Sequence, residues 1–429
     1  MRPTLLVLAL IAVASSASAQ PTFSNEVSRI MQGKCQRCHR PDDIAPMALI
    51  SYDDASTWAE DIKRVLSQNI MPPWKPVPGH GDFQGSYGLT PEERQTILDW
   101  IDAGAPQGDP AQMPDPLPDT GEWQLGYPDL VLQMPQVFDV PRVKDTYRCF
   151  VIPTGLDEDK YVNALQVLPG NKQIVHHVLL FLDTSGAAEK LDGADGYPGY
   201  PCYGGPGFDI GVSTIEQVLS GSFGLGGWVP GSQIFPLPDD VGIFLPKEAK
   251  VVMQVHYFPN GRPGPDQTKL GLYFSKKPVD KRLRYLPLVN TTFKIQPGEA
   301  DKVVIAEAPL PLGAHLVNIA PHMHLLGTKI KVELQPRSGD PNDLILINDW
   351  DFNWQGFYNY KEPVALPFLS KVRLTCDFNN TEDNPRNPNN PLKTVGWGEG
   401  TEDEMCLAFL GVTLDVEHLN SGFNLKKIR

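Results

Sequence analysis

Ile174-Val175-His176-His177-Val178-Leu179-Leu180-Phe181-Leu182 is a short apolar run rich in β-branched and aromatic residues, and it predicts a strand. Segments of the same kind recur between clusters of Pro and Gly at residues 161–167, 250–257, 269–274, 314–319, 329–334 and 371–376. Such a series favours a β-sandwich or jelly roll over a βαβ fold. Because about 300 residues is long for one sandwich, we expect two, with a boundary near residues 276–282.

The region before these strands has a different, helical periodicity. Apolar residues recur at helical spacing in residues 23–31 and 58–66. Thr90-Pro91-Glu92-Glu93 combines an N-cap residue, a Pro at the first helical position and a Glu at the third, which predicts the start of another helix. Residues 106–121 are then rich in Pro, Asp and Gly, a composition typical of a linker.

Cys35-Gln36-Arg37-Cys38-His39 lies in this helical region and reads C-x-x-C-H, the attachment signature of a c-type haem. The two thiols add covalently to the haem, and the imidazole of His39 binds the iron. A disulfide or a chance match is the alternative interpretation. We expect Met71, on a loop fixed by Pro, to be the distal iron ligand. Met47 is its rival, and a buried structural Met is the alternative for Met71.

Residues 1–19 have the pattern of a secretory leader, in which Arg2 precedes an apolar run and small residues end at Ala19. Haem c is assembled outside the cytoplasm, so we expect an exported protein, either periplasmic or secreted. The predicted fold class is multidomain. It comprises the leader (1–19), a small all-α cytochrome c domain (20–105), the linker (106–121) and two all-β, jelly-roll-like sandwich domains (122–278 and 279–429).

The composition restricts the partners and the redox state. A net charge of −14 over 429 residues argues against a nucleic acid or an anionic membrane surface as partner. After the leader, no apolar run is long enough to cross a bilayer, so we expect no transmembrane segment. Six cysteines less two for haem leave Cys149, Cys202, Cys376 and Cys406, which indicate two disulfides in an exported protein. Four thiols allow three pairings, and the spacing does not choose among them.

Five of the nine histidines fall into three patterns: His176-His177, His256 and His322-Met323-His324. Residues at i and i+2 of a strand face the same side, so His322 and His324 can converge on one metal, with Met405 as a third ligand. A thioether with imidazoles suits copper and would make a poor zinc site. His176 and His177 can share a metal with His256 only at a strand end or a bulge.

The remaining histidines are expected to have structural roles. A single His in a strand is more often hydrogen bonded within the protein than bound to a metal. We give that interpretation to His80, His315 and His418. Met323, inside the H-x-H pattern, should point away from its neighbours into a core.

These motifs resemble those of the copper type II, ascorbate-dependent monooxygenases, the family that includes peptidylglycine α-hydroxylating monooxygenase and dopamine β-monooxygenase. The resemblance extends from about Trp123 to the C-terminus. It rests on the motifs Asp145-Thr146-Tyr147-Arg148-Cys149, His176-His177-Val178, Gln254-Val255-His256-Tyr257, His322-Met323-His324-Leu325-Leu326-Gly327 and Asp403-Glu404-Met405-Cys406.

The resemblance implies a fold, two metals and a disulfide pairing. The family fold is two consecutive β-sandwich domains, each with one copper that faces a solvent-filled cleft. One ion, for electron transfer, would be bound by His176, His177 and His256. The other, which binds O2, would be bound by His322, His324 and Met405. The implied disulfides are Cys149–Cys202 and Cys376–Cys406.

Two departures from the family matter for function. The peptide-amidating enzyme binds a substrate carboxylate with an Arg and a Tyr, at positions that are Ala320 and Phe409 here. A carboxylate would lose partners worth roughly 1.5–3 kcal/mol each, so we expect a more hydrophobic or neutral substrate. The second departure is the haem signature, which suggests a tethered one-electron carrier that reloads the coppers.

The sequence therefore predicts an exported copper- and haem-dependent monooxygenase that hydroxylates a C–H bond of an organic substrate with O2. It would carry one haem c and two copper ions. An external donor, either a reduced redox protein or an ascorbate-like reductant, would supply electrons. The alternatives are a copper and haem protein for electron transfer or metal handling, and a binding module without chemistry. A peroxidase would require an open haem position, which Met71 would block.

Overall fold

The computed structural model describes residues 20–41, 43–118, 121–142, 145–203, 205–209, 224–258 and 263–421. The leader expected at residues 1–19 lies outside the described residues. The chain forms two compact units. We call Met1–Pro41, Ala45–Pro72 and Leu89–Leu117 the helical unit, and Asp42–Ile44, Pro73–Gly88 and Pro118–Arg429 the β unit.

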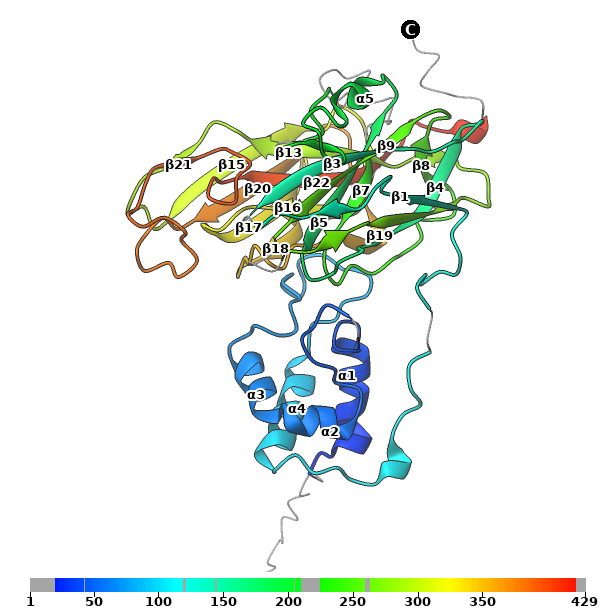
Figure 1. Ribbon diagram of the computed structural model, residues 1–429. Helices are drawn as coiled ribbons and strands as arrows, with labels where there is room; N and C mark the ends of the chain where they lie inside the picture. Colours follow the sequence, from blue (N-terminus) through cyan, green and yellow to red (C-terminus); the bar gives the residue numbers. More distant parts are fainter. Residues whose placement is uncertain are drawn as a thin grey trace, which may run out of the picture. The chain divides into compact units, whose positions relative to one another are not determined.

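The helical unit is built from short helices around one small core (Figure 1). They are η1 (Phe23–Val27, a π-helix), α1 (Ser28–Lys34), α2 (Tyr52–Thr57), α3 (Ala59–Ser67), α4 (Pro91–Asp102) and the 3₁₀-helix η2 (Pro110–Gln112). Helix α4 starts at the predicted capping box, in which Glu93 N donates to Thr90 Oγ1 over 3.1 Å and Thr90 N to Glu93 Oε2 over 2.9 Å. Phe23, Met31 and Trp100 fill the core between these helices.

Residues that follow α4 pack back onto the helical unit. The Pro106 carbonyl accepts hydrogen bonds from Phe23 N and from the Trp100 indole, both over 3.0 Å. Gln32 Nε2 donates to the Asp115 carbonyl over 2.9 Å. The first part of the expected linker is therefore tied to the helices.

The first half of the β unit holds two five-stranded sheets, with strand orders β1-β11-β4-β8-β12 and β6-β3-β9-β5-β7, and a two-stranded sheet β10-β2. We call these the first sheet pair. Residues from both large sheets, among them Val162 and Val251, share one core. The elements are β1 (Leu130–Gln133), β2 (Phe138–Asp139), β3 (Thr146–Pro153), β4 (Lys160–Leu168), β5 (Val175–Asp183), α5 (Ala187–Leu191), β6 (Tyr200–Pro201), β7 (Gly224–Trp228), β8 (Val241–Leu245), β9 (Lys250–Tyr257), β10 (Pro265–Asp266), β11 (Lys269–Phe274) and β12 (Lys281–Arg282).

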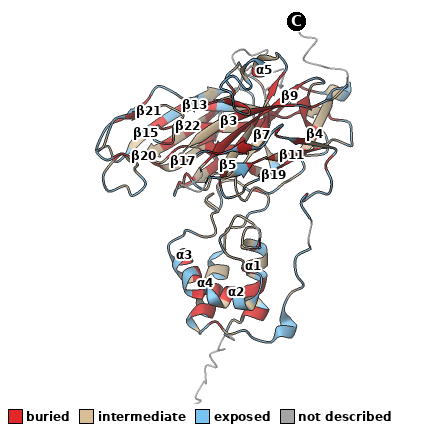
Figure 2. Ribbon diagram, in the orientation of Figure 1, coloured by how far each residue is buried: buried red, intermediate tan, exposed pale blue. Residues whose placement is uncertain are grey.

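The second half repeats this plan with two four-stranded sheets, β13-β22-β16-β19 and β15-β20-β17-β18, and a two-stranded sheet β14-β21. We call these the second sheet pair, and they enclose a separate core (Figure 2). The elements are β13 (Arg284–Asn290), β14 (Lys294–Ile295), β15 (Lys302–Pro309), β16 (Ala314–His322), β17 (Gly327–Gln335), β18 (Asn342–Ile347), β19 (Tyr358–Leu366), β20 (Lys371–Phe378), β21 (Val395–Gly396), β22 (Cys406–Leu414) and the 3₁₀-helix η3 (Leu419–Ser421).

The two sheet pairs meet without a linker. Strand β12 pairs with β8 of the first pair, and β13 of the second pair begins after only Leu283, which is 1% exposed. Glu417 lies buried at this junction, where its carboxylate accepts hydrogen bonds from Arg282 Nε and Arg284 Nη2, each over 2.7 Å. The two cores therefore belong to one compact unit.

The β unit also takes in residues 73–88, which the sequence assigns to the helical region. Phe83 is 4% exposed in the second core and forms an isolated β-bridge with Tyr360. Trp74 packs edge-on against Tyr358, with ring centroids 5.4 Å apart. This segment leaves the helices after α3 and returns before α4, because its aromatic side chains are buried in the second core.

The predicted fold class is therefore wrong. The described structure is mostly β-sheet with few, short helices, and residues 20–105 do not form an independent all-α cytochrome c domain. The two sheet pairs fall within one compact unit, each with a core of its own, and their expected division into two domains stays a prediction. Helical periodicity predicted α3 and α4, but it could not show that the chain between them packs elsewhere.

Two disulfides stabilise the β unit, Cys149–Cys202 and Cys376–Cys406. They have the pairing that the family resemblance implies. The second joins β20 to β22 across the two large sheets of the second pair. In the part of the chain that the structure describes, no helix is long and apolar enough to span a membrane.

Candidate metal centres

The first histidine cluster forms at a β-bulge. Along β5, Val175 pairs with Tyr257 and His177 with His256, so His176 is the extra residue between two paired positions. The bulge turns neighbouring side chains toward the same point. His177 Nδ1 lies 3.2 Å from His176 Nδ1 and 3.4 Å from His256 Nδ1. Three imidazole nitrogens therefore converge, one from each ring.

His256 is held in place by two residues: Tyr147, on β3, and Asp145, which directly precedes that strand. Its Nε2 lies 2.9 Å from Asp145 Oδ1, and Tyr147 stacks on its ring with centroids 4.1 Å apart and planes 5° apart. A carboxylate on Nε2 fixes the proton there and leaves Nδ1 as the lone-pair donor. The sequence motif contains Asp145, but nothing in its spacing indicated this contact.

Burial keeps the three imidazoles of this cluster neutral, the state in which they can bind a metal. Burial lowers the pKa of His176 to about 4, and it lowers the pKa of His177 and His256 well below the ordinary value. The imidazoles are therefore neutral near pH 7, as ligands must be.

The second cluster begins at the end of β16. His322 Nδ1 contacts Gln355 Oε1, and His324 Nδ1 donates to the Asp403 carbonyl over 3.1 Å. Because both partners are oxygen acceptors, both Nδ1 atoms carry the proton and both Nε2 atoms are available to a metal. The rings lie 5.0 Å apart at 86°. Burial lowers the pKa of His322 to about 4 and of His324 to about 3.

Glu404 joins the strand end that carries the two histidines to the segment that carries Met405. Its buried carboxylate accepts hydrogen bonds from the backbone N–H of His324 over 2.9 Å, Leu326 over 2.6 Å and Met405 over 3.1 Å. Burial raises its pKa to about 8 despite these bonds. Sequence analysis assigned no role to Glu404. Met323, between the two histidines, lies in the second core as predicted.

Met405 shares a cavity of about 400 Å³ with His322, His324 and His177. The other lining residues are mostly apolar: Tyr147, Leu179, Phe181, Gly205, Pro206, Phe208, Trp228, Val229, Gln254, Pro287, Val289, Thr291, Ala320, Pro321, Gln355, Gly356, Phe357, Trp397, Glu399, Leu407 and Phe409. Glu399 is the one carboxylate among them, and none is Lys or Arg. Both histidine clusters therefore contribute to one cavity with apolar walls.

The C-x-x-C-H residues lie at the end of α1 in the helical unit. Neither Cys35 nor Cys38 is part of a disulfide, and burial raises the pKa of Cys35 to about 12. His39 Nδ1 donates to the Met47 carbonyl over 3.1 Å, which leaves its Nε2 as the possible ligand atom. Met71 lies in the same unit, shortly after α3. Haem attachment at this motif stays a prediction.

The three histidines expected to be structural are all paired with carboxylates. The Nδ1 atoms lie 2.6 Å from Asp343 for His80, 2.8 Å from Asp415 for His315 and 2.8 Å from Asp280 for His418. None of the three rings faces another imidazole. Their hydrogen bonds agree with the structural interpretation.

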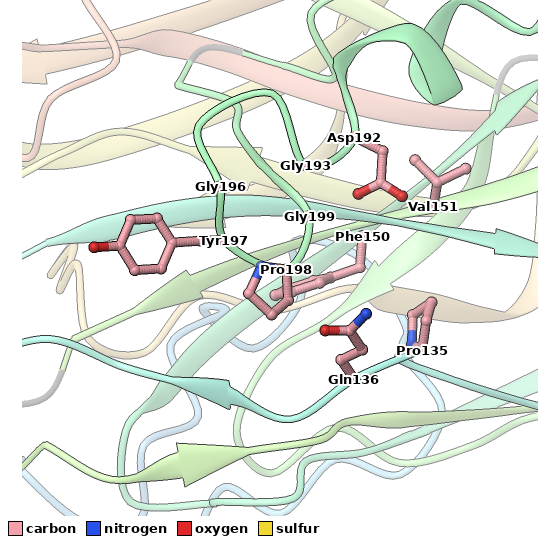
Figure 3. A pocket seen from close by; sticks show the side chains of 10 residues that line it. All are labelled: Pro135, Gln136, Phe150, Val151, Asp192, Gly193, Gly196, Tyr197, Pro198 and Gly199. Carbon is pink, nitrogen blue, oxygen red and sulfur yellow. The ribbon is translucent and has the colours of Figure 1, made fainter.

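A second cavity, of about 290 Å³, lies beside the Gly-rich segment that follows α5 (Figure 3). Its lining has no histidine, cysteine or methionine: Pro135, Gln136, Phe150, Val151, Asp192, Gly193, Gly196, Tyr197, Pro198 and Gly199. It therefore lacks the ligand types that mark the first cavity.

Comparison with known proteins points to one family. Residues 299–413 match the sequence profile of the C-terminal domain of the copper type II ascorbate-dependent monooxygenases. DBH-like monooxygenase protein 1 of Homo sapiens is 26% identical over 309 residues, which cover 67% of this chain and 47% of that protein. DBH-like monooxygenase protein 2 of Mus musculus is 26% identical over 301 residues, which cover 63% and 44%.

The chain spans about half the length of the curated relatives it matches. Among solved structures, PNGF-II aligns over 66% of this chain and 65% of its own, with 10% identity and a TM-score of 0.29. A likeness that weak carries no argument about fold or function. The residues that match the family profile, 299–413, include His322, His324 and Met405.

Proposed function

We propose that this chain is a member of the copper type II ascorbate-dependent monooxygenase family, whose C-terminal domain profile matches residues 299–413, and that it hydroxylates a C–H bond of an organic substrate with O2 at the shared cavity. One observation carries the proposal: His177 of the first cluster lines the same largely apolar cavity as His322, His324 and Met405. Copper, when bound, would supply the electrons and the activation of O2.

The donor geometry fits copper. We propose that His176, His177 and His256 bind one ion through Nδ1, and that His322 and His324, through Nε2, bind the other with Met405. Two nitrogens at about 2 Å from one metal lie roughly 3 Å apart, which agrees with the Nδ1 separations of 3.2 and 3.4 Å. A thioether beside two imidazoles favours copper over zinc.

The cavity supports an apolar, neutral substrate. Ala320 and Phe409 line it at the positions where the peptide-amidating relatives bind a carboxylate. A substrate carboxylate would meet no Lys or Arg among the lining residues and would approach Glu399. We therefore propose that apolar contacts hold the substrate, while the walls exclude bulk water from the reacting carbon.

We further propose that Cys35, Cys38 and His39 bind one haem c, which passes single electrons to the coppers. Because Met47 contacts His39 through its backbone carbonyl, we take Met71 as the better candidate for the second ligand of a bound haem iron. An external reductant would reload the haem. The two disulfides support export, and the periplasm would provide both oxidising conditions and haem attachment.

The test is a metal count followed by a product assay with ¹⁸O2. The purified protein should contain two copper ions and one haem per chain, and label should appear in an organic alcohol. The variant His324→Ala should lose product formation, whereas His315→Ala should keep it, because His315 lies on β16, the strand that leads to the second cluster, but pairs with Asp415. Zinc in the clusters, or label only in water, would contradict the proposal.

A further inference from the structure

One aromatic ring contacts both histidine clusters. Phe352 lies between β18 and β19, and it is 5% exposed. Its ring stacks on His176, with centroids 5.2 Å apart and planes 23° apart, and meets His324 edge-on with centroids 5.6 Å apart. His176 belongs to the first sheet pair and His324 to the second. The ring therefore lies between imidazoles from the two halves of the β unit.

The loop that carries Phe352 also holds the second cluster. The Trp350 indole donates to the His324 carbonyl over 3.1 Å, and Gln355 Oε1 accepts from His322 Nδ1. Gln355 Nε2 in turn donates to the Phe352 carbonyl over 2.9 Å. One short segment thus contacts both histidines of the second cluster and reaches one histidine of the first.

Contacts with residues outside the two clusters hold this loop in place. Asp349 pairs with Lys75 Nζ over 2.8 Å, and Trp350 N donates to the Thr328 carbonyl over 2.9 Å. Arg386 contacts the Trp350 carbonyl from another side. Anchors on both sides of Trp350 restrict the positions that the Phe352 ring can take.

Phe352 is buried without belonging to either core. It is absent from the core of the first sheet pair and from that of the second, although most buried aromatic side chains of the β unit lie in one of them. Its ring contacts the imidazoles of His176 and His324. A side chain needed only to fill a core would be expected among aliphatic neighbours.

We propose that Phe352 is a positioning residue that sets the separation of the two metal sites. The phenyl ring has no atom that can bind a metal or carry a proton, so its effect comes through packing alone. It keeps the His176 and His324 rings apart by one ring width. The inference rests on the proposed function only in taking both clusters as copper sites.

The test measures the distance between the two sites in the copper-loaded full-length protein by pulsed electron paramagnetic resonance between the two Cu(II) ions. The wild type and Phe352→Tyr should give one narrow distance distribution. Phe352→Ala should broaden it at least about twofold or shift its mean, because the His176 and His324 rings lose their shared support. Phe293→Ala is the matched control, since that buried ring stacks on Phe378 in the second core, away from both clusters.

A second readout needs no metal. In metal-free protein, Phe352→Ala should speed hydrogen exchange about fivefold or more in peptides covering residues 174–178 and 320–326 together. Faster exchange confined to residues 349–357 overturns the inference, as does an unchanged copper–copper distance or the same change in Phe293→Ala. Failure to bind two coppers contradicts the proposed function instead, and the exchange measurement then decides the role of Phe352.

Discussion

At the scale of single residues, the contact between Asp145 and His256 determines which imidazole nitrogen is free. Asp145 Oδ1 lies 2.9 Å from His256 Nε2, on the side opposite the convergence point of the cluster. Asp145→Asn removes the charge that favours the Nε2–H form, so copper affinity at the first cluster should fall by roughly 10–100-fold.

Competition titration against a copper chelator measures this effect, and one of the two binding steps should weaken. Asp280→Asn is the control, because Asp280 bonds His418 outside both clusters. Equal copper affinity in Asp145→Asn and the wild type would show that the carboxylate does not orient the ligand.

The buried histidines also predict how pH acts on the metal-free protein. Burial lowers the pKa of His322 to about 4 and of His324 to about 3, from an ordinary value of 6.5. Below pH 6.5 the unfolded chain binds protons that the folded protein does not, so stability is full above that pH and falls as the pH drops toward 4.

Thermal unfolding of metal-free protein at about pH 7.5 and about pH 5 measures this dependence. A double variant, His322→Gln with His324→Gln, cannot titrate at these positions and should lose less stability between the two pH values. An equal loss in both proteins would assign the acid sensitivity to other groups.

The grouping of the histidines could be predicted from the sequence, but the residues that orient them could not. The H-x-H spacing and the need for a bulge at His176 follow from strand geometry alone. Asp145, Gln355 and Glu404 are 111, 33 and 80 positions from the histidine residues they contact. No local pattern connects residues so far apart, because only the folded sheets bring them together.

At the scale of elements, the segment 73–88 behaves as part of the second sheet pair. Phe83→Ala should destabilise the protein by roughly 3–5 kcal/mol, because it empties a core position and removes one aromatic neighbour from each of Tyr358 and Tyr360. Denaturant unfolding followed by the fluorescence of the β unit measures the loss. Leu117→Ala, at an exposed position of the helical unit, should change stability by no more than about 0.5 kcal/mol.

Periodicity predicted the long strands and missed the irregular ones. The expected strand at 174–182 is β5, Val175–Asp183, because its apolar run is continuous. Strand β13 carries Pro287 and alternates poorly, and β10, β14 and β21 have two residues each, too few for a pattern. Residues 73–88 were placed in the helical domain, 20–105. Their Pro and Gly residues indicate a loop, but they do not show which part of the protein that loop packs against.

At the scale of the whole molecule, the buried ion group at Glu417 joins the two sheet pairs. Burial acts to raise the Glu417 pKa, but the hydrogen bonds from Arg284 hold it below its ordinary value. Glu417→Gln would leave Arg282 and Arg284 buried without a counter-charge, which should cost roughly 3–5 kcal/mol. Equilibrium unfolding in urea measures this, with Glu307→Gln, at a partly exposed ion pair with Arg373, as the control.

A loss no larger than that of the control would mean that water or another carboxylate replaces Glu417. The sequence could not indicate this group, because Glu417 is 135 positions from Arg282. The sequence also predicted a domain boundary near residues 276–282, where basic residues and a Pro suggest a connection between two domains. In the structure this stretch ends in a paired strand followed by one buried residue, and the division into two domains stays a prediction.

The route of residues 73–88 has a consequence for how this protein can be dissected. The chain leaves the helical unit and re-enters it, so the helices are not a module appended to one end. If a protease cut the chain once, after residue 117, the two products should stay associated, because residues 73–88 of the first product pack in the second core of the β unit. A truncated protein that starts at residue 122 would lack Trp74 and Phe83. Part of the second core of its β unit would therefore be exposed to solvent.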